Sequence, residues 1–257
     1  MLYHLKRHPF PVVARFEHCL VLTYAAQREA LASLLPPGLE LDVLKRRPDL
    51  GFLAIALVQT RELRPAGAPF WLGRDFFLSG YRVFARFRTP SGRVLRGLRI
   101  LRSDTDSRLM AALGNRLTHY NYQEASVNLT HSDLRLAVKI TTPHRAADLH
   151  AVAELDPAQA ELPPNTCFVS ECEARRFSGP LPYTFDYEDR TGSMIVIQAT
   201  RQRWRPRLVN LRVLENTFFE RPPFTADPPV LVGAFYNTDV AYRWERGVPY
   251  GLARVVA

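Results

Sequence analysis

One short stretch of the sequence places two carboxylates where they could act together. Asp104 and Asp106 stand two residues apart, just before a segment with helical periodicity. Close carboxylates push each other's pKa apart, so the pair could serve as a general acid and base. Acidic side chains at a helix start also accept hydrogen bonds from free backbone N–H groups. We favour helix capping, shared with Thr105 and Ser107, and keep acid–base catalysis as the alternative.

A second stretch, from His119 to Tyr122, combines an imidazole with two phenols. His119 belongs to the residue type that most often moves protons near neutral pH, and Tyr120 and Tyr122 add hydrogen-bond donors. A single histidine beside tyrosines is more commonly a structural group than a catalytic one. Ligand contact or catalysis by His119 therefore stands as the alternative to a structural role.

Arginines are the candidate ligand-binding groups. Arg82 and Arg99 lie in strand-like segments whose alternation would aim each side chain at one face of a sheet. A half-buried guanidinium against an apolar wall suits a carboxylate or an enolate. We favour an ion pair with Glu124, Glu171 or Glu173 instead, because buried charges usually have a partner in the chain.

Charge and motif content argue against several functional classes. The formal charge is +9, but 31 of the 34 basic residues are arginines that spread along the whole chain, whereas basic grooves usually show clustering. His4 and His8 have the i, i+4 spacing of a metal pair, yet Pro9 follows and no glutamate accompanies them. No Gly-rich phosphate loop is present. We expect no nucleic-acid partner, no metal and no cofactor.

Short runs of aromatic and β-branched residues between Pro, Gly and Asn predict a mainly β fold with few helices. Helices are expected at 27–35 and 106–117, and in the second Leu109, Leu113 and Leu117 fall on one face. Gly114 weakens that helix. Strands are expected at 16–24, 39–44 and 51–60 as a hairpin, 81–88 and 93–102 as a second hairpin, 134–140, 167–177, 193–200, 208–213 and 236–244.

Length and composition are typical of one domain over residues 1–257. The three cysteines imply no disulfide framework, and the N-terminus shows no signal peptide. No apolar run is long enough for a membrane helix. We expect a cytoplasmic protein with no membrane partner. An exposed apolar edge would permit a homo-oligomer, and the sequence leaves the oligomeric state open.

Motifs in a fixed order carry a resemblance to a known family. The first is Leu34-Leu35-Pro36-Pro37-Gly38-Leu39-Glu40-Leu41, and the second is the passage over residues 96–109. Stretches at 170–182, 203–206 and 242–247 extend the match. With these the chain resembles the YqjF-like proteins, an uncharacterised family of the acetoacetate decarboxylase-like superfamily. The resemblance implies a closed or partly closed antiparallel β-barrel with an interior pocket and a few short helices.

The resemblance also indicates which chemistry is missing. Acetoacetate decarboxylases carry a lysine at the strand end before a helix, and it forms a Schiff base with a β-keto acid. The matching stretch here is Asp106-Ser107-Arg108, and the three lysines of the chain, Lys6, Lys45 and Lys139, lie elsewhere. Arginine stays protonated and cannot form the imine. The superfamily's covalent step is therefore not expected, although Arg108 remains a candidate ligand contact.

A further departure concerns an acid. Many YqjF-like relatives have a glutamate four residues before the arginine that matches Arg82, and Leu78 takes that place here. We expect a protein that binds a small organic acid or carbonyl compound, and that could be a lyase or isomerase without an imine. The alternative is a non-catalytic binding or scaffold protein with a filled pocket. The expected ligand contacts are Arg82, Arg99, Arg108, His119, Tyr120 and Tyr122, with His119, Asp104 and Asp106 as candidate catalytic groups.

Overall fold

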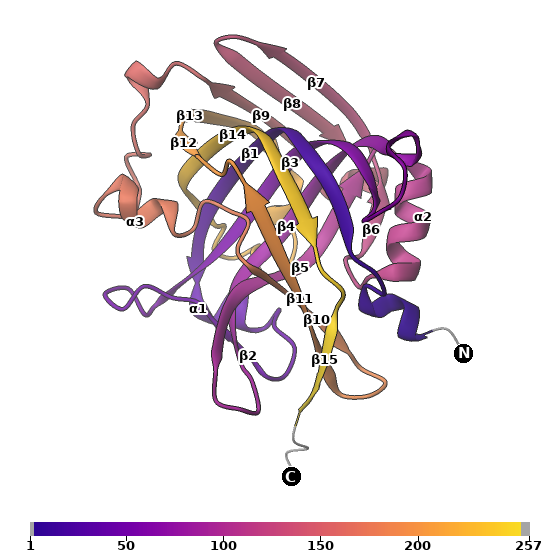
Figure 1. The fold of residues 1–257 in the computed structure, drawn as a ribbon. Helices are drawn as coiled ribbons and strands as arrows, with labels where there is room; N and C mark the ends of the chain where they lie inside the picture. Colours follow the sequence, from indigo (N-terminus) through magenta and orange to yellow (C-terminus); the bar gives the residue numbers. More distant parts are fainter. Residues whose placement is uncertain (1–2, 253–257) are drawn as a thin grey trace.

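Long strands with alternating burial make up most of the molecule (Figure 1). The computed structural model describes residues 3–252. The main sheet contains β1 (Val12–Gln27), β2 (Leu39–Leu41), β3 (Leu50–Pro65), β4 (Arg74–Arg88), β5 (Val94–Thr105), β6 (Tyr122–Glu124), β10 (Tyr183–Glu188), β11 (Ser193–Gln202), β12 (Arg207–Leu208), β14 (Val230–Trp244) and β15 (Val248–Gly251). The second sheet contains β7 (Ser126–Ser132), β8 (Arg135–Thr141), β9 (Leu149–Glu154) and β13 (Asn210–Asn216).

The main sheet closes on itself. Within residues 3–252, the strands β14, β1, β3, β4, β5, β10 and β11 pair in that order, and β11 then pairs with β14 from Ala199↔Trp244 to Gln202↔Ala241. Each contact around this ring is antiparallel except β5 with β10, where Tyr183↔Gly97 begins a short parallel ladder. The predicted closed, largely antiparallel sheet is confirmed, and 236–244 does complete it as part of β14.

The two faces of the ring have different neighbours. Along β3, Leu53, Ile55 and Leu57 point outward into one buried cluster. The alternate residues, from Phe52 to Val58, point inward and join a second cluster inside the ring. Because side chains alternate along a strand, one apolar run supplies both cores.

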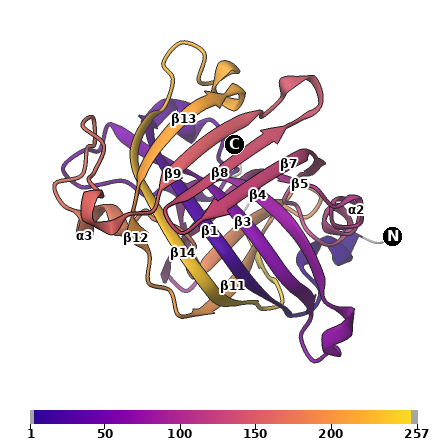
Figure 2. The ribbon, with the colours of Figure 1, turned by 90° about the horizontal axis from the view of Figure 1, so that it is seen from above.

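The second sheet covers the outer face of β1, β3 and β4, and its strands cross theirs when the molecule is viewed from above (Figure 2). Leu136, Val138 and Ile140 of β8 point into the shared core, whereas Arg135 and Lys139 are exposed. The clean alternation over 134–140 therefore predicted this strand and its buried face.

Helices are short and lie at the edges of the sheets (Figure 1). They are α1 (Arg28–Ala32), α2 (Arg108–Leu117) and α3 (Glu171–Arg175), with 3₁₀ turns at η1 (Tyr3–Arg7), η2 (Phe70–Leu72), η3 (Pro143–Arg145), η4 (Pro157–Gln159) and η5 (Thr217–Glu220). The N-cap of α2 is Ser107, whose hydroxyl accepts from the backbone N–H of Met110 at 3.2 Å. Ser107 is thus confirmed as the residue that caps α2, whereas Asp104 and Asp106 do not cap it.

Three sequence expectations were wrong. Residues 167–177 contain α3 instead of a strand, because Ser170 caps a helical turn in which Glu171 and Arg175 form an i, i+4 ion pair of 2.7 Å. Residues 39–44 do not form a hairpin with 51–60, since β2 pairs with β4. Residues 208–213 divide between β12 of the main sheet and β13 of the second sheet.

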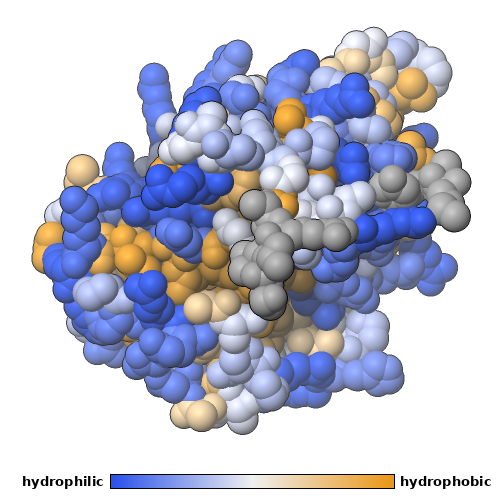
Figure 3. Space-filling view, turned by 90° about the horizontal axis from the view of Figure 1, so that it is seen from below, coloured by the Kyte–Doolittle hydropathy of each residue, from blue (hydrophilic) through white to orange (hydrophobic). Residues whose placement is uncertain are grey.

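Hydrophilic residues cover most of the lower face of the molecule, and a band of apolar residues runs inward from one edge (Figure 3). None of the helices within residues 3–252 is both long and apolar enough to cross a membrane.

Gly114 provides a test of how α2 packs. A Cβ at this position would lie 2.3 Å from the ring of Tyr122, so the helix approaches β6 closely only because the residue is glycine. Gly114→Ala should destabilise the protein by about 1–3 kcal/mol through overpacking. Helix propensity alone would instead stabilise it by about 1 kcal/mol. Chemical denaturation measures whether the free energy of unfolding of Gly114→Ala is lower or higher than that of wild type.

The exposed Ala112 of α2 supplies the control. Ala112→Gly measures the propensity difference at a neighbouring helical position without a packing change. If Gly114→Ala stabilised the protein by as much as Ala112→Gly destabilises it, the close contact with Tyr122 would not exist.

Candidate functional site

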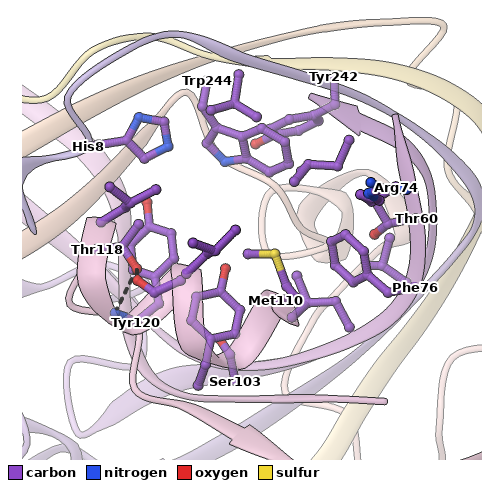
Figure 4. A pocket seen from close by; sticks show the side chains of 18 of the residues that line it. His8, Thr60, Arg74, Phe76, Ser103, Met110, Thr118, Tyr120, Tyr242 and Trp244 are labelled. Carbon is purple, nitrogen blue, oxygen red and sulfur yellow. Dashed lines mark hydrogen bonds between the residues drawn. The ribbon is translucent and has the colours of Figure 1, made fainter. Parts of the chain in front are cut away.

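The inside of the ring is filled at one end and open at the other. Phe52, Phe84 and Phe177 pack together at the filled end, with ring centroids of Phe52 and Phe177 4.1 Å apart. Toward the other end lies a pocket of about 420 Å³, within the size range of small-molecule sites. Side chains from several elements surround it, among them His8, Tyr120, Tyr242 and Trp244 (Figure 4).

The pocket wall is apolar, and its few charges are positive. Among the described residues that line it none is acidic, and the arginines are Arg64, Arg74 and Arg82. Leu78 is part of the wall. Such a pocket favours an anionic ligand, because a cation would meet only like charges.

Arg82 is the central polar group of the pocket. Other half-buried arginines form ion pairs, such as Arg99 with Asp186 at 3.0 Å and Arg102 with Asp104 at 2.7 Å. Within residues 3–252, Arg82 has no hydrogen-bond or ion-pair partner, and its Nε is buried. A buried donor without a partner costs free energy, so it calls for a ligand or a functional reason.

The guanidinium of Arg82 packs closely against the backbone of its own strand. A Cβ on Gly80 would lie 2.8 Å from Nε of Arg82, so the guanidinium rests on the bare backbone of β4. Burial raises the pKa of Tyr242 to about 12 and that of Tyr122 still higher, while the nearby Arg82 charge opposes both shifts. Both phenols therefore stay protonated and can donate hydrogen bonds beside the cation. All three groups line the pocket.

His8 supplies an imidazole that the sequence did not indicate as a ligand contact. Its backbone is held in the left-handed region at φ 54° by hydrogen bonds to Leu117 and from Gly247. The side chain is 7% exposed, lines the pocket, and has no partner for Nδ1. Burial lowers its pKa to about 4, so the ring is neutral at physiological pH. A neutral ring can donate or accept one hydrogen bond with a ligand.

Tyr120 and Tyr122 are among the residues that line the pocket, and His119 is not. The backbone N–H of His119 donates to Oδ2 of Asp186 at 3.4 Å, and its ring contributes a buried Nε2 without a partner. Burial, Lys6 and Arg99 lower the pKa of His119. This histidine contacts the Arg99–Asp186 pair, and none of these three residues is among those that line the pocket. The ion pair favoured for Arg99 exists, with Asp186 as its partner in place of the three glutamates considered.

The remaining sequence candidates lie outside the pocket lining. Asp104 points to the outer core and accepts from Ser79 and Arg102, and burial raises its pKa. Asp106 accepts from the backbone N–H of Phe77 at 2.8 Å, which ties β4 to the start of α2. Arg108 is 90% exposed and forms an ion pair with Glu124 at 3.3 Å. The structure thus brings together Arg82, Tyr120 and Tyr122, and separates them from the other candidates.

No lysine lies in the pocket. Lys6, Lys45 and Lys139 are all exposed on the surface. At the end of β5, where the superfamily's lysine is expected, Ser107 contributes to the pocket wall and Arg108 points away from it. The pocket residues offer no primary amine for an imine.

The closed ring, its inner pocket and the second sheet define an acetoacetate decarboxylase-like fold. An acetoacetate decarboxylase-like enzyme from Sphingomonas wittichii RW1 matches with a TM-score of 0.61 at 12% identity, over 95% of this chain and 94% of that one. Acetoacetate decarboxylase from Legionella pneumophila matches at 0.60 and 13% identity, over 97% and 90%. The enduracididine biosynthesis enzyme MppR, in complex with pyruvate, matches at 0.59 and 13%, over 94% and 90%.

Sequence comparison defines the family more narrowly. The profile of DUF2071, described as an uncharacterized conserved protein, matches residues 13–238, so the chain belongs to this family. No curated protein matches the chain. The expected membership of an uncharacterised family is confirmed, and so is the expected acetoacetate decarboxylase-like fold.

The Arg99–Asp186 pair predicts how stability depends on pH. Burial raises the pKa of Asp186 to about 6, and Arg99 only partly opposes this shift. A carboxyl group with a raised pKa binds protons more tightly in the folded state, so its contribution to stability falls as the pH rises from about 4 to about 6. The free energy of unfolding should fall by an amount on the order of 3 kcal/mol. Each pKa unit of difference between the folded protein and a free aspartate, whose pKa is about 3.9, corresponds to about 1.4 kcal/mol.

Asp186→Asn removes this titration while Asp104 and the other acids stay in place. The free energy of unfolding of wild type minus that of the variant should decline between pH 4 and 6 and stay constant above pH 7. Urea denaturation at each pH measures it. A difference that rises over this interval would mean that the ion pair, and not burial, dominates the ionisation of Asp186.

Proposed function

We propose that this protein binds an organic acid or carbonyl compound in the pocket, with the ligand's carboxylate or enolate oxygen on Arg82. The unpaired guanidinium of Arg82, in a pocket without acidic residues, is the observation that carries the proposal. An arginine fork matches a carboxylate through two parallel hydrogen bonds. The open volume speaks against the alternative of a scaffold with a filled interior.

The pocket also has groups that suit reactions of carbonyl compounds. Tyr122 and Tyr242 are protonated donors near the guanidinium, and the neutral imidazole of His8 faces the same space. Donors fixed around an oxygen stabilise negative charge as it develops there, which favours enolate formation. A lyase or isomerase that polarises a carbonyl group, without a covalent amine step, fits this set. The crystal structure of a similar fold with pyruvate adds support for ligands of this class.

Loss of the Arg82 charge should abolish tight binding. A charge-assisted hydrogen bond in a buried site contributes about 1.5–3 kcal/mol, so Arg82→Met should weaken the binding of organic acids by roughly 10- to 100-fold. Isothermal titration calorimetry with a panel of keto acids and simple carboxylates measures the affinities. Arg74→Met, which removes an exposed arginine at the pocket rim, is the matched control and should change affinity less than about threefold.

Gly80→Ala provides a second variant in which the charge is kept. The new Cβ would displace the guanidinium of Arg82 and leave the fold intact, because the contact is with the end of a flexible side chain. We expect an affinity between those of wild type and Arg82→Met. Equal binding by wild type and Arg82→Met would overturn the proposal.

Absence of the covalent step can be tested directly. Incubation with acetoacetate and borohydride, followed by intact mass measurement, should give no adduct on Lys6, Lys45 or Lys139, since all three lie outside the pocket. Pyridoxal phosphate with borohydride is the positive control, because it labels exposed amines. A stable acetoacetate adduct on any lysine would contradict the proposed non-covalent chemistry.

A further inference from the structure

The open end of the pocket is lined by apolar side chains that remain partly exposed. Leu109 and Leu113 of α2 are 52% and 42% exposed, and Leu72 of η2 and Phe10 are 38% and 39% exposed. All four line the pocket. Large apolar residues gathered at the mouth of a cavity leave apolar surface in water, which a bound ligand would remove.

Arg82 and two tyrosines form a polar group at the opposite, deep end. Arg82 is near Tyr122 and Tyr242, both of which are 6% exposed. Along β4, Phe76 and Leu78 stand between Arg82 and the mouth, and Phe84 closes the inner end. On the α2 side the site therefore changes from a charged floor to an apolar mouth, whereas Arg64 and Arg74 line the pocket from β3 and β4.

The volume sets the size of a ligand that would fill the site. At about 30 Å³ for each water-sized group, a pocket of about 420 Å³ holds a molecule of roughly a dozen non-hydrogen atoms. A keto acid the size of pyruvate would occupy less than half of this space. A small acid would also leave the exposed leucines at the mouth uncovered.

We infer that the ligand is an amphipathic monocarboxylic acid, with its carboxylate on Arg82 and an aliphatic or aryl tail of medium length directed toward Leu109 and Leu113. This inference rests on the proposed function and specifies its ligand class. The single unpaired cation at the floor matches one carboxylate. The α2 side of the wall, toward which the tail points, consists of Leu109, Met110, Leu113, Gly114 and Leu117 and offers no partner for a second polar group.

Affinity should depend on chain length in wild-type protein. Butanoate, hexanoate, octanoate and decanoate are titrated by calorimetry at one pH and salt concentration. Each buried methylene should tighten binding about fourfold, until the tail reaches the mouth at about ten carbons. Octan-1-ol, which has the tail without the carboxylate, should bind at least tenfold more weakly than octanoate.

Leu113→Asp tests the position of the tail. An acidic group at this exposed site should weaken octanoate binding at least tenfold and leave butanoate binding within about twofold of wild type. Leu134→Asp is the matched control, because Leu134 is 66% exposed and does not line the pocket. Leu134→Asp should change neither the octanoate affinity nor the butanoate affinity.

The outcomes separate the inference from the proposed function. Butanoate binding that needs Arg82, with no gain from longer tails or no effect of Leu113→Asp, would overturn the amphipathic ligand and keep the organic-acid site. Octanoate binding that is lost in Arg74→Met and kept in Arg82→Met would place the carboxylate at the rim, and would overturn both. Failure of every acid to bind would also overturn both.

Discussion

The pairing of β11 with β14 joins the two edges of the main sheet, and the pocket depends on it. Trp244 pairs with Ala199 on one side and with Val12 on the other, so one position of β14 links the first and last thirds of the chain. Tyr242 and Trp244 enter the pocket wall from this strand. Without closure the sheet would have an open edge there, and the wall behind Arg82 would be missing. The site is therefore a product of long-range pairing, since no single segment contains it.

Charge is distributed by two opposite rules in this protein. On the strands around the ring, several half-buried arginines pair with acids, as Arg86 and Arg96 do with Asp42. Arg82 and Arg201 each keep a buried Nε without a hydrogen-bond partner, and of these two only Arg82 lines the pocket. An unpaired cation at this place has a cost in stability. Such costs are usually retained where binding needs a charge that is already in position.

The sequence predicted what local pattern determines. Alternation over 134–140 gave β8, the leucine spacing gave α2, and strand parity placed Arg82 on an inward face. It could not identify Asp186 as the partner of Arg99, because that contact joins strands 87 residues apart in sequence. His8 reaches the pocket only because backbone hydrogen bonds hold an N-terminal turn against α2. Over 171–175, the i, i+4 spacing of Glu171 and Arg175 indicated a helix. The alternation of charged residues in the same stretch led to the wrong prediction of a strand.

The charged floor of the pocket lies on a strand of the ring, whereas the mouth of the pocket is formed by short helices. Arg82 rests on the main chain of β4 at Gly80, in the interior of the ring. The mouth is built by α2 and η2, whose apolar side chains remain partly exposed. Because these exposed side chains contribute little to the core, substitutions there should cost less stability than substitutions around Arg82. In the proposed binding mode, substitutions on α2 and η2 would change which ligand tails fit, while Arg82 would hold the same kind of charged group.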